Sequence, residues 1–192
     1  FIGEEGIGKQ TLGREFAKAV LCNSEDEKPC DTCKPCVEFN TNNNVNFTII
    51  NEEGVAIKIE QIRNMQVKIA EKPLNSDYKI YLINDADLMT TEAQNCLLKT
   101  LEEPPSHVKF ILATTEPQKL PATILSRCQR FDFKKISNED IAKRLKYVAK
   151  ESNIEITEDA IRLISVLAEG AMRDALSILA VSYTHLRAHE TG

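Results

Sequence analysis

The pattern of apolar residues along the chain predicts several strands before residue 135. The run Lys79–Ile83 is almost continuously apolar, as in a strand buried on both faces of a parallel sheet. Residues 108–115 have the same character. Residues 47–51 and 130–134 are shorter strand candidates, and Phe1-Ile2 resembles the end of another.

Apolar residues at helical spacing lie between these strands. One helix is predicted around residues 59–69 and ends before Pro73. Another covers residues 93–101, is capped by Thr90 or Thr91, and ends before Pro104-Pro105. Alternating strands and helices predict an α/β fold, a three-layer domain with a parallel sheet.

After residue 135 the pattern becomes purely helical. Ser137 with Asp140 resembles a capping box, Thr157 opens a second helix, and Gly170 ends it before a third. We therefore expect an α/β domain over residues 1–135 and a small, truncated all-α lid domain over residues 136–180.

The two ends of the chain are unusual. Residues 181–192, VSYTHLRAHETG, follow a helical pattern without continuing it and resemble translated adapter sequence, so we expect a non-native tail. The alternative is a metal-binding tail that uses His185 and His189. Because Phe1 is not an initiator residue, we expect the chain to be a fragment that lacks its N-terminus.

Composition limits the classes of function. The chain has 192 residues, 42% of them hydrophobic, and a formal charge of −5. It contains no run of about 18 apolar residues, so no membrane span is expected. Because of the net acidity, contact with nucleic acid requires a local basic surface, such as lysines and arginines of the lid, or partner chains.

The segment GEEGIGKQT at residues 3–11 has the spacing of a P-loop. Gly3, Gly6 and Gly8 allow the backbone N–H groups to point at phosphate oxygens, and Lys9 adds a positive charge. A helix should follow, with an apolar face that begins at Leu12 and continues through Phe16, Ala19 and Val20. The alternative is a glycine-rich turn without a ligand.

The residues that hold Mg²⁺ in such sites are altered here. Gln10 stands where Ser or Thr normally follows the lysine, and Thr11 comes one residue late. After the strand Lys79–Ile83, Asn84 replaces the metal-binding Asp, and Asp85 replaces the Glu that orients water. We expect ATP binding with doubtful Mg²⁺ binding and little hydrolysis. The alternative, that Asn84 and Asp85 merely cap the strand, is compatible with this loss of hydrolysis.

Four cysteines form a candidate metal site: Cys22, Cys30, Cys33 and Cys36. Two overlapping C-x-x-C steps and four sulfur ligands suit a closed, structural tetrahedral Zn²⁺ site. A disulfide or a redox C-x-x-C pair is the alternative. The remaining two, Cys96 and Cys128, are expected to be small buried apolar residues.

Arg127 follows a short helix-like segment, residues 120–125. A guanidinium at a domain edge can reach the γ-phosphate of a neighbouring subunit as an arginine finger. The alternative is an ordinary surface ion pair.

Several motifs together resemble the AAA+ subunits of the bacterial DNA polymerase III clamp loader. They are GEEGIGKQT, the four-cysteine insert, KIYLINDADLM, NCLLKTLEEPP, FILATTEPQKLPATILSRCQRF and GAMRDALSIL, and they span residues 1–179. The altered P-loop, IKIEQIRNMQ and NDAD resemble delta prime, the stator subunit. The stretch from Phe110 resembles gamma/tau, the ATPase motor, so a chimera is conceivable.

The resemblance implies further roles. Thr114 or Thr115 would be the sensor-1 residue, Arg173 the sensor-2 arginine, and Arg127 would act in trans on ATP of a motor subunit. Expected partners are the other subunits of a hetero-pentamer, the sliding clamp and, through the assembly, primer–template DNA. We expect a cytoplasmic protein without polymerase activity of its own.

Overall fold

The computed structural model describes the backbone of residues 1–190 and the side chains of residues 1–183. The chain forms two compact units. The first contains residues 1–2 and 9–132, and the second contains residues 3–8 and the chain from Phe133 onward.

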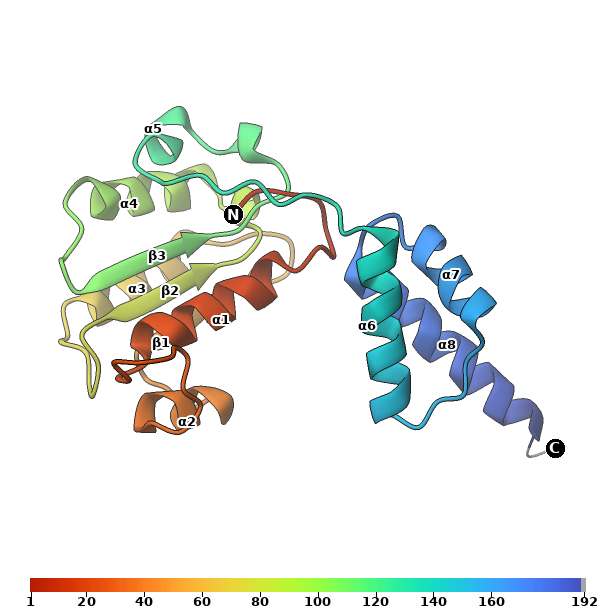
Figure 1. Ribbon diagram of the computed structural model, residues 1–192. Coiled ribbons are helices and arrows are strands. Elements are labelled where there is room, and N and C mark those ends of the chain that lie inside the picture. The colour runs from red at the N-terminus through yellow and green to blue at the C-terminus, as the bar shows by residue number, and fades with distance from the viewer. Residues whose placement is uncertain (191–192) are drawn as a thin grey trace. The chain divides into compact units, whose positions relative to one another are not determined.

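The first unit is built on a parallel three-stranded sheet (Figure 1). Its strand order is β1 (Phe47–Ile50), β2 (Lys79–Ile83) and β3 (Val108–Leu112). Single parallel bridges continue the sheet beyond β3, where Ile2 pairs with both Thr114 and Asp132. The strands predicted at the chain start and at residues 130–134 are therefore present only as isolated bridges.

Helices cover both faces of this sheet because β2 is buried on both sides. Ile80 and Leu82 pack in the cluster that includes α1 (Lys9–Leu21). The alternate residues Tyr81 and Ile83 pack in the cluster with α3 (Ile59–Ile69) and α4 (Thr91–Glu102). The predicted three-layer α/β fold is confirmed.

The predicted apolar face of α1 is wrong in its first turns. Leu12 and Phe16 are 52% and 53% exposed, whereas Gly13 and Ala17 are buried. A Cβ atom on Gly13 would lie 3.2 Å from a methyl group of Leu82. The helix thus approaches the sheet through its smallest residues, which the spacing of large apolar residues could not indicate.

Shorter elements complete the first unit: α2 (Lys34–Asn40), α5 (Ala122–Leu125) and two 3₁₀ turns, Ala86–Leu88 and Pro117–Lys119. The apolar pattern does not predict α2, because a seven-residue helix among cysteines and prolines has too few turns to show a period.

The second unit contains α6 (Asn138–Glu151), α7 (Glu158–Leu167) and α8 (Met172–Glu190) around an apolar core. The predicted caps are confirmed: the Ser137 hydroxyl accepts a hydrogen bond from the Asp140 N–H at 3.1 Å, and the Thr157 hydroxyl accepts one from the Ala160 N–H at 3.3 Å. Within the described residues, no helix is both long enough and apolar enough to cross a bilayer.

The expectation that the helical pattern stops near residue 180 is wrong for the backbone, since α8 continues to Glu190. Residues 181–190 contain neither Gly nor Pro, so nothing in the sequence breaks the helix. The side chains of His185 and His189 lie outside the described residues, and the origin of residues 181–192 stays a prediction.

Gly170 supports a first testable prediction. Its φ is +92°, and a Cβ atom there would lie 2.6 Å from Cβ of Lys135. We expect Gly170→Ala to lower the free energy of unfolding of the second unit by about 2 kcal/mol or more, in urea denaturation. Gly54→Ala is the control in the first unit: its φ is +81° and no described residue beyond its chain neighbours lies within 4 Å of the added Cβ, so it should lower the free energy of unfolding of that unit by only about 1 kcal/mol. If Gly170→Ala and Gly54→Ala lowered stability equally, the clash between the added methyl group and Lys135 would be relieved by local movement.

Candidate functional site

The residues predicted after β2 and β3 lie at one edge of the sheet, where the carboxyl ends of the parallel strands meet. The Asn84 N–H donates to Ile50 O at 3.0 Å, and the Thr114 N–H donates to Phe1 O at 3.0 Å. In open α/β sheets, ligands bind outside this edge. The fold therefore brings Asn84, Asp85 and Thr114 to the expected position for a ligand site.

Asn84 is the most informative of these residues. The residue is buried, with 6% of its surface exposed, and its Nδ2 donates to Oδ1 of Asn51 at 2.8 Å. Its Oδ1 has no hydrogen-bond partner among the described residues. A buried polar atom without a partner is costly, so this oxygen is suited to a ligand or a bound water. No sequence motif predicts the role of Asn51.

Thr114 is held by the carboxylate of Asp87, which was not among the predicted site residues. Its hydroxyl donates to Oδ1 of Asp87 and accepts from the Glu116 N–H, the latter at 3.0 Å. Thr114 is 2% exposed, whereas Thr115 is half-buried. Of the two sensor-1 candidates, Thr114 is therefore the one with a fixed hydroxyl. The only sequence signal for Asp87 is its place in the NDAD run.

The glycine-rich loop and Arg173 lie together within the second unit. Gly6 has φ +74°, and its carbonyl accepts a hydrogen bond from the Arg173 N–H at 3.3 Å. A Cβ atom on Gly6 would lie 3.0 Å from Cβ of Ala171. The Arg173 guanidinium forms an ion pair with Glu5. A phosphate bound by Arg173 would have to compete with this carboxylate.

The start of α1 has the features of a phosphate loop. Gly8 has φ +98°, and apart from Gly8 and its chain neighbours no described residue has a heavy atom within 4 Å of a Cβ built there. Lys9 opens α1 and is buried, while Gln10 and Thr11 are exposed on its first turn. Positive φ values at glycine, followed directly by a helix N-terminus, are suited to anions.

Arg127 contacts its own unit. Its Nη1 donates to Thr123 O at 2.7 Å, and its Nη2 lies 3.5 Å from Oε1 of Glu102. Both side chains of this ion pair are solvent-exposed in part, at 36% and 50%. An exposed pair of this kind stabilises the fold little, by about 0–1 kcal/mol, so Arg127 can be released at small cost.

The four cysteines of the insert converge. Their Sγ atoms all lie within 4.8 Å of one another, and the Sγ atoms of Cys22 and Cys33 are 3.8 Å apart. Sulfurs bound tetrahedrally to Zn²⁺ at about 2.3 Å are about 3.8 Å apart. All six cysteines are unpaired thiols. The four sulfur atoms and the distances between them therefore fit a tetrahedrally coordinated metal ion. Zn²⁺ is the ion that four cysteine ligands favour.

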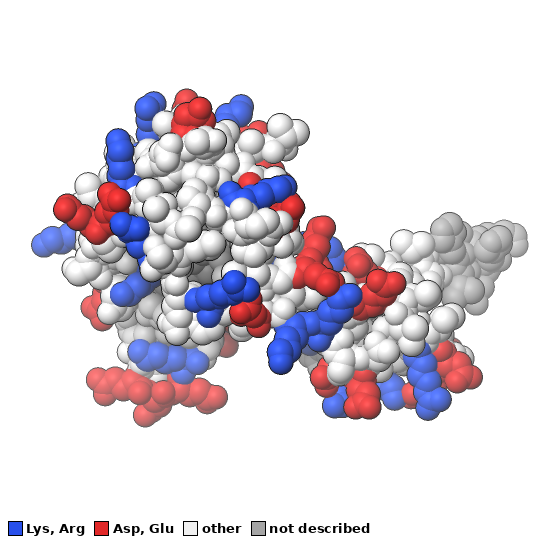
Figure 2. Space-filling view, turned by 90° about the horizontal axis from the view of Figure 1, so that it is seen from above, with Lys and Arg blue, Asp and Glu red and all other residues white. Residues whose placement is uncertain are grey.

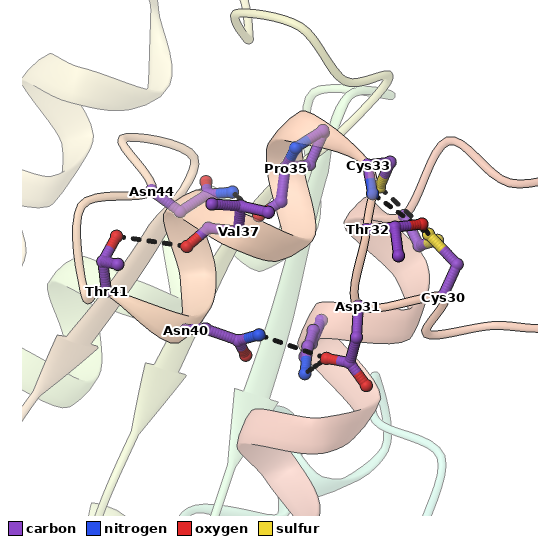
Figure 3. Close-up of polar contacts among 11 residues, drawn as sticks. Cys30, Asp31, Thr32, Cys33, Pro35, Val37, Asn40, Thr41 and Asn44 are labelled. Atoms are coloured by element: carbon purple, nitrogen blue, oxygen red, sulfur yellow. Dashed lines mark hydrogen bonds and ion pairs between the residues drawn. The ribbon is translucent and has the colours of Figure 1, made fainter.

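Hydrogen bonds to sulfur shape this cluster (Figure 3). Cys30 Sγ accepts from the Thr32 hydroxyl at 3.6 Å and from the Cys33 N–H at 3.3 Å. These hydrogen bonds lower the pKa of Cys30 to about 6, and the bond from the Thr32 side chain has the largest effect. Burial, together with Cys33, raises the pKa of Cys36 to about 12. A bound dication lowers the pKa of a coordinating thiol, which offsets the burial at Cys36.

An ion pair ties the cluster to α1. Lys18 of α1 pairs with Asp31, whose carboxylate also accepts from the Asn40 side chain at 3.2 Å (Figure 3). The hydrogen bond to Asp31 raises the pKa of Lys18, and the bond from Lys18 lowers the pKa of Asp31. The insert is thereby fixed to the helix that follows the P-loop.

The two remaining cysteines differ from the prediction. Cys96 and Cys128 are only partly buried. Cys96 is partly exposed and donates from its thiol to Oε1 of Gln66 at 3.2 Å, so it acts as a polar contact between α3 and α4.

Charged residues of both signs are interspersed on the face shown in Figure 2, without a continuous basic surface. With a net charge of −5, this distribution gives no support to a DNA-binding module acting alone.

Comparison with known proteins adds independent information. A sequence model described as DNA polymerase III, delta subunit, matches residues 1–137, and one described as the clamp loader subunit ATPase lid domain matches residues 140–183. DNA polymerase III subunit tau of Bacillus subtilis is 40% identical over 187 residues, which are 96% of this chain and 33% of that protein. Subunit tau of Escherichia coli is 39% identical over 179 residues, 93% of this chain and 28% of that protein.

Solved structures resemble the fold. A DNA polymerase III gamma subunit-related protein of Thermotoga maritima has a TM-score of 0.52 and 24% identity, covering 88% of this chain and 56% of its own. The RuvB Holliday junction branch migration motor of Thermotoga maritima has a TM-score of 0.63 and 15% identity, covering 92% and 50%. At these identities the likeness concerns the fold alone.

A parallel α/β sheet, a phosphate-type loop leading into a helix, and a helical lid define an AAA+ P-loop module. Two observations identify the family of this module. The family models match residues 1–137 and 140–183, and a curated relative is 40% identical over 96% of the chain. The chain belongs to the family of DNA polymerase III clamp-loader subunits. It spans about a third of the length of the Bacillus subtilis relative, 33%.

Proposed function

We propose that this chain is the AAA+ module of a clamp-loader subunit, with the α/β domain over residues 1–135, the lid over residues 136–180 and a non-native tail over residues 181–192. In the whole loader it would join other subunits in a hetero-pentamer that places a sliding clamp on primer–template DNA. Family membership supports this proposal.

The module binds ATP in this proposal. The loop of residues 3–8 and Lys9 would hold the phosphates, Thr114 and Arg173 would serve as the two sensors, and Asn84 would be a further nucleotide-binding residue. Two separate observations support this proposal: the open space at Gly8 before the N-terminus of α1, and the Asn84 oxygen, which has no partner among the described residues.

The subunit acts as a stator, because its own site lacks the groups that hold Mg²⁺. The observation that carries this proposal is Asn84: a buried, neutral amide stands where a carboxylate is needed, and its amide group is engaged with Asn51. Gln10 adds a second loss, since an amide replaces the metal-binding hydroxyl. A misplaced catalytic group costs about 100-fold in rate.

The alternative is a gamma/tau-type ATPase motor, in which Thr11 and Asp85 compensate for the replaced residues. The names of the curated relatives favour it, since subunits named tau or gamma match at about 40% identity, such as 40% for subunit gamma of Buchnera aphidicola. A motor would hydrolyse ATP at its own site.

ATP turnover by the chain separates the two. We expect that the unchanged chain binds a fluorescent ATP analogue but turns over ATP with Mg²⁺ at a rate near background. Gln10→Thr with Asn84→Asp should raise the rate by about 100-fold, because the hydroxyl and the carboxylate restore the metal ligands.

The matched control is Gln10→Thr with Asn84→Ser, which restores the hydroxyl without the carboxylate and should stay near background. A high rate in the unchanged chain that the double variant hardly alters would establish the motor instead. Equal analogue binding by all three chains ensures that only hydrolysis differs.

The cysteine cluster holds a structural Zn²⁺ ion in this proposal. The ligands would be Cys22, Cys30, Cys33 and Cys36, and four sulfur ligands leave no open position for catalysis. The ion would connect the C-terminal end of α1 to the turn before α2.

Arg127 acts in trans in this proposal, as the arginine finger for ATP held by an adjacent motor subunit. Its partial exposure and its weak, exposed pair with Glu102 support a side chain that can leave its own unit. The catalytic contribution would then appear only in the assembled loader.

A further inference from the structure

β1 is an edge strand with an unprotected outer side. Asn46 O accepts from the Ile80 N–H at 2.7 Å and Ile50 O accepts from the Asn84 N–H at 3.0 Å, so the even-numbered positions face β2. In a parallel pair the alternate residue, Ile49, then points its N–H and C=O away from the sheet. Within residues 1–190 no strand pairs with this side.

Apart from its shortness, the edge lacks the usual protection against added strands. β1 has the sequence FTII, with neither a charged residue nor a proline, and Val45 just before it is 64% exposed. Sheets normally protect exposed edges with charges, prolines or bulges. A short, uncharged edge of this kind can accept three or four residues of another strand.

A cavity of about 170 Å³ opens beside this edge. Its lining comes from β1, α1, α2 and the turn between α2 and β1: Arg14, Phe39, Asn42, Asn44, Phe47 and Ile49. Phe47 and Ile49 lie two positions apart, so their side chains share one face of the sheet. A strand added outside β1 would place the side chain opposite Ile49 on this same face.

Arg14 gives the cavity its charge. Its guanidinium lies 5.4 Å from the ring centre of Phe39 and 5.6 Å from that of Phe47, and its Nη2 donates to Asn42 Oδ1 at 2.8 Å. A guanidinium has five N–H donors, and no carboxylate pairs with Arg14 among the described side chains. The stacked, positioned donors are suited to a carboxylate.

We propose that this edge binds an extended acidic peptide segment of a partner protein as an antiparallel strand. The residue opposite Ile49 is Glu or Asp; its N–H and C=O pair with those of Ile49, and its carboxylate enters the cavity to bind Arg14. The backbone edge favours a peptide over a nucleic acid, and the single arginine in a cavity of about 170 Å³ favours one acidic side chain. The site is separate from the nucleotide site.

The first test uses peptides and the unchanged chain. Fluorescein-labelled Thr-Val-Glu-Val-Thr should bind in fluorescence anisotropy, and the analogue with Gln in place of Glu should bind about tenfold more weakly. N-methylation of the Glu residue should abolish binding, because its N–H faces β1. N-methylation of either Val, whose N–H faces solvent, should leave the affinity within about twofold.

The second test uses the protein. Arg14→Met keeps the length of the side chain but removes the charge, so it should weaken the Glu peptide by about tenfold and leave the Gln peptide unchanged. Arg130→Met is the matched control, since Arg130 pairs with Asp132 and is exposed.

Several outcomes would overturn the proposal. They are no binding of the Glu peptide, equal binding of the Glu and Gln peptides, and equal binding of the peptide N-methylated at Glu and the peptides N-methylated at Val. Concentration-dependent dimerisation that the peptide does not reverse would show that a second copy of the chain occupies the edge. Because ATP turnover does not enter these measurements, their result is independent of the proposed stator function.

Discussion

Replacing Arg127 with alanine is expected to lower ATP turnover of the assembled loader by about 1,000-fold at the site of the adjacent subunit. A trans-acting guanidinium stabilises the charge on the transferred phosphoryl group, and its removal typically costs 10³-fold or more. The measurement is the steady-state ATPase rate of a loader reconstituted from the subunits of the same organism.

The fold should tolerate this replacement. Arg127 loses a hydrogen bond to Thr123 O and an exposed ion pair with Glu102, each of which contributes little to stability. Glu102→Gln is an informative companion variant, because it frees Arg127 from its partner while keeping the finger. It should leave turnover of the loader unchanged or raise it slightly.

Arg130→Ala is the matched control for Arg127→Ala. Arg130 lies three residues away, is exposed, and forms its ion pair with Asp132. If both variants lowered turnover equally, or if Arg127→Ala left it unchanged while the subunit still assembled, Arg127 would be an ordinary surface residue and the trans role would be wrong.

Replacing Cys30 and Cys33 with serine is expected to reduce the bound zinc from about one ion per chain to none. A hydroxyl is a poor zinc ligand, so two of four positions would be lost. Structural zinc in small sites contributes about 10 kcal/mol or more to local folding, so the turn before α2 should unfold. Metal analysis of the purified chain measures the first effect, and hydrogen exchange across residues 22–40 measures the second.

Cys96→Ser with Cys128→Ser is the matched control, since it removes the same number of thiols away from the cluster. It should leave the zinc content unchanged. Zinc retained by the Cys30/Cys33 variant would contradict the metal site. Absence of zinc from the unchanged chain, purified with zinc present, would contradict it as well.

Strong local patterns predicted much of the fold correctly. The strand Lys79–Ile83 and the caps Ser137 and Thr157 match the structure, because a doubly buried strand and a capping hydroxyl leave clear local signals. The face of α1 was wrong, because the spacing of large residues does not reveal that Gly13 must approach β2. The missed helix α2 was too short to show a period.

The candidate site likewise contains residues that the sequence predicted and contacts that it could not predict. The sequence identified the loop, the four cysteines and the amide at Asn84, since residue type and spacing carry that information. It could not identify Asp87 as the partner of Thr114, or Glu102 as the partner of Arg127, because these pairs join segments 27 and 25 residues apart.

The sequence by itself determined which chemical groups this protein has: a phosphate loop without its metal-binding hydroxyl, an amide in place of a carboxylate, and four sulfurs at zinc spacing. Only the tertiary structure decided which groups meet, including the sulfurs within 4.8 Å and the stacked Arg14 beside the edge of β1. The physical reason is that residue type and local spacing are encoded along the chain, whereas burial and long-range contacts arise only when the strands pair and the helices pack on them.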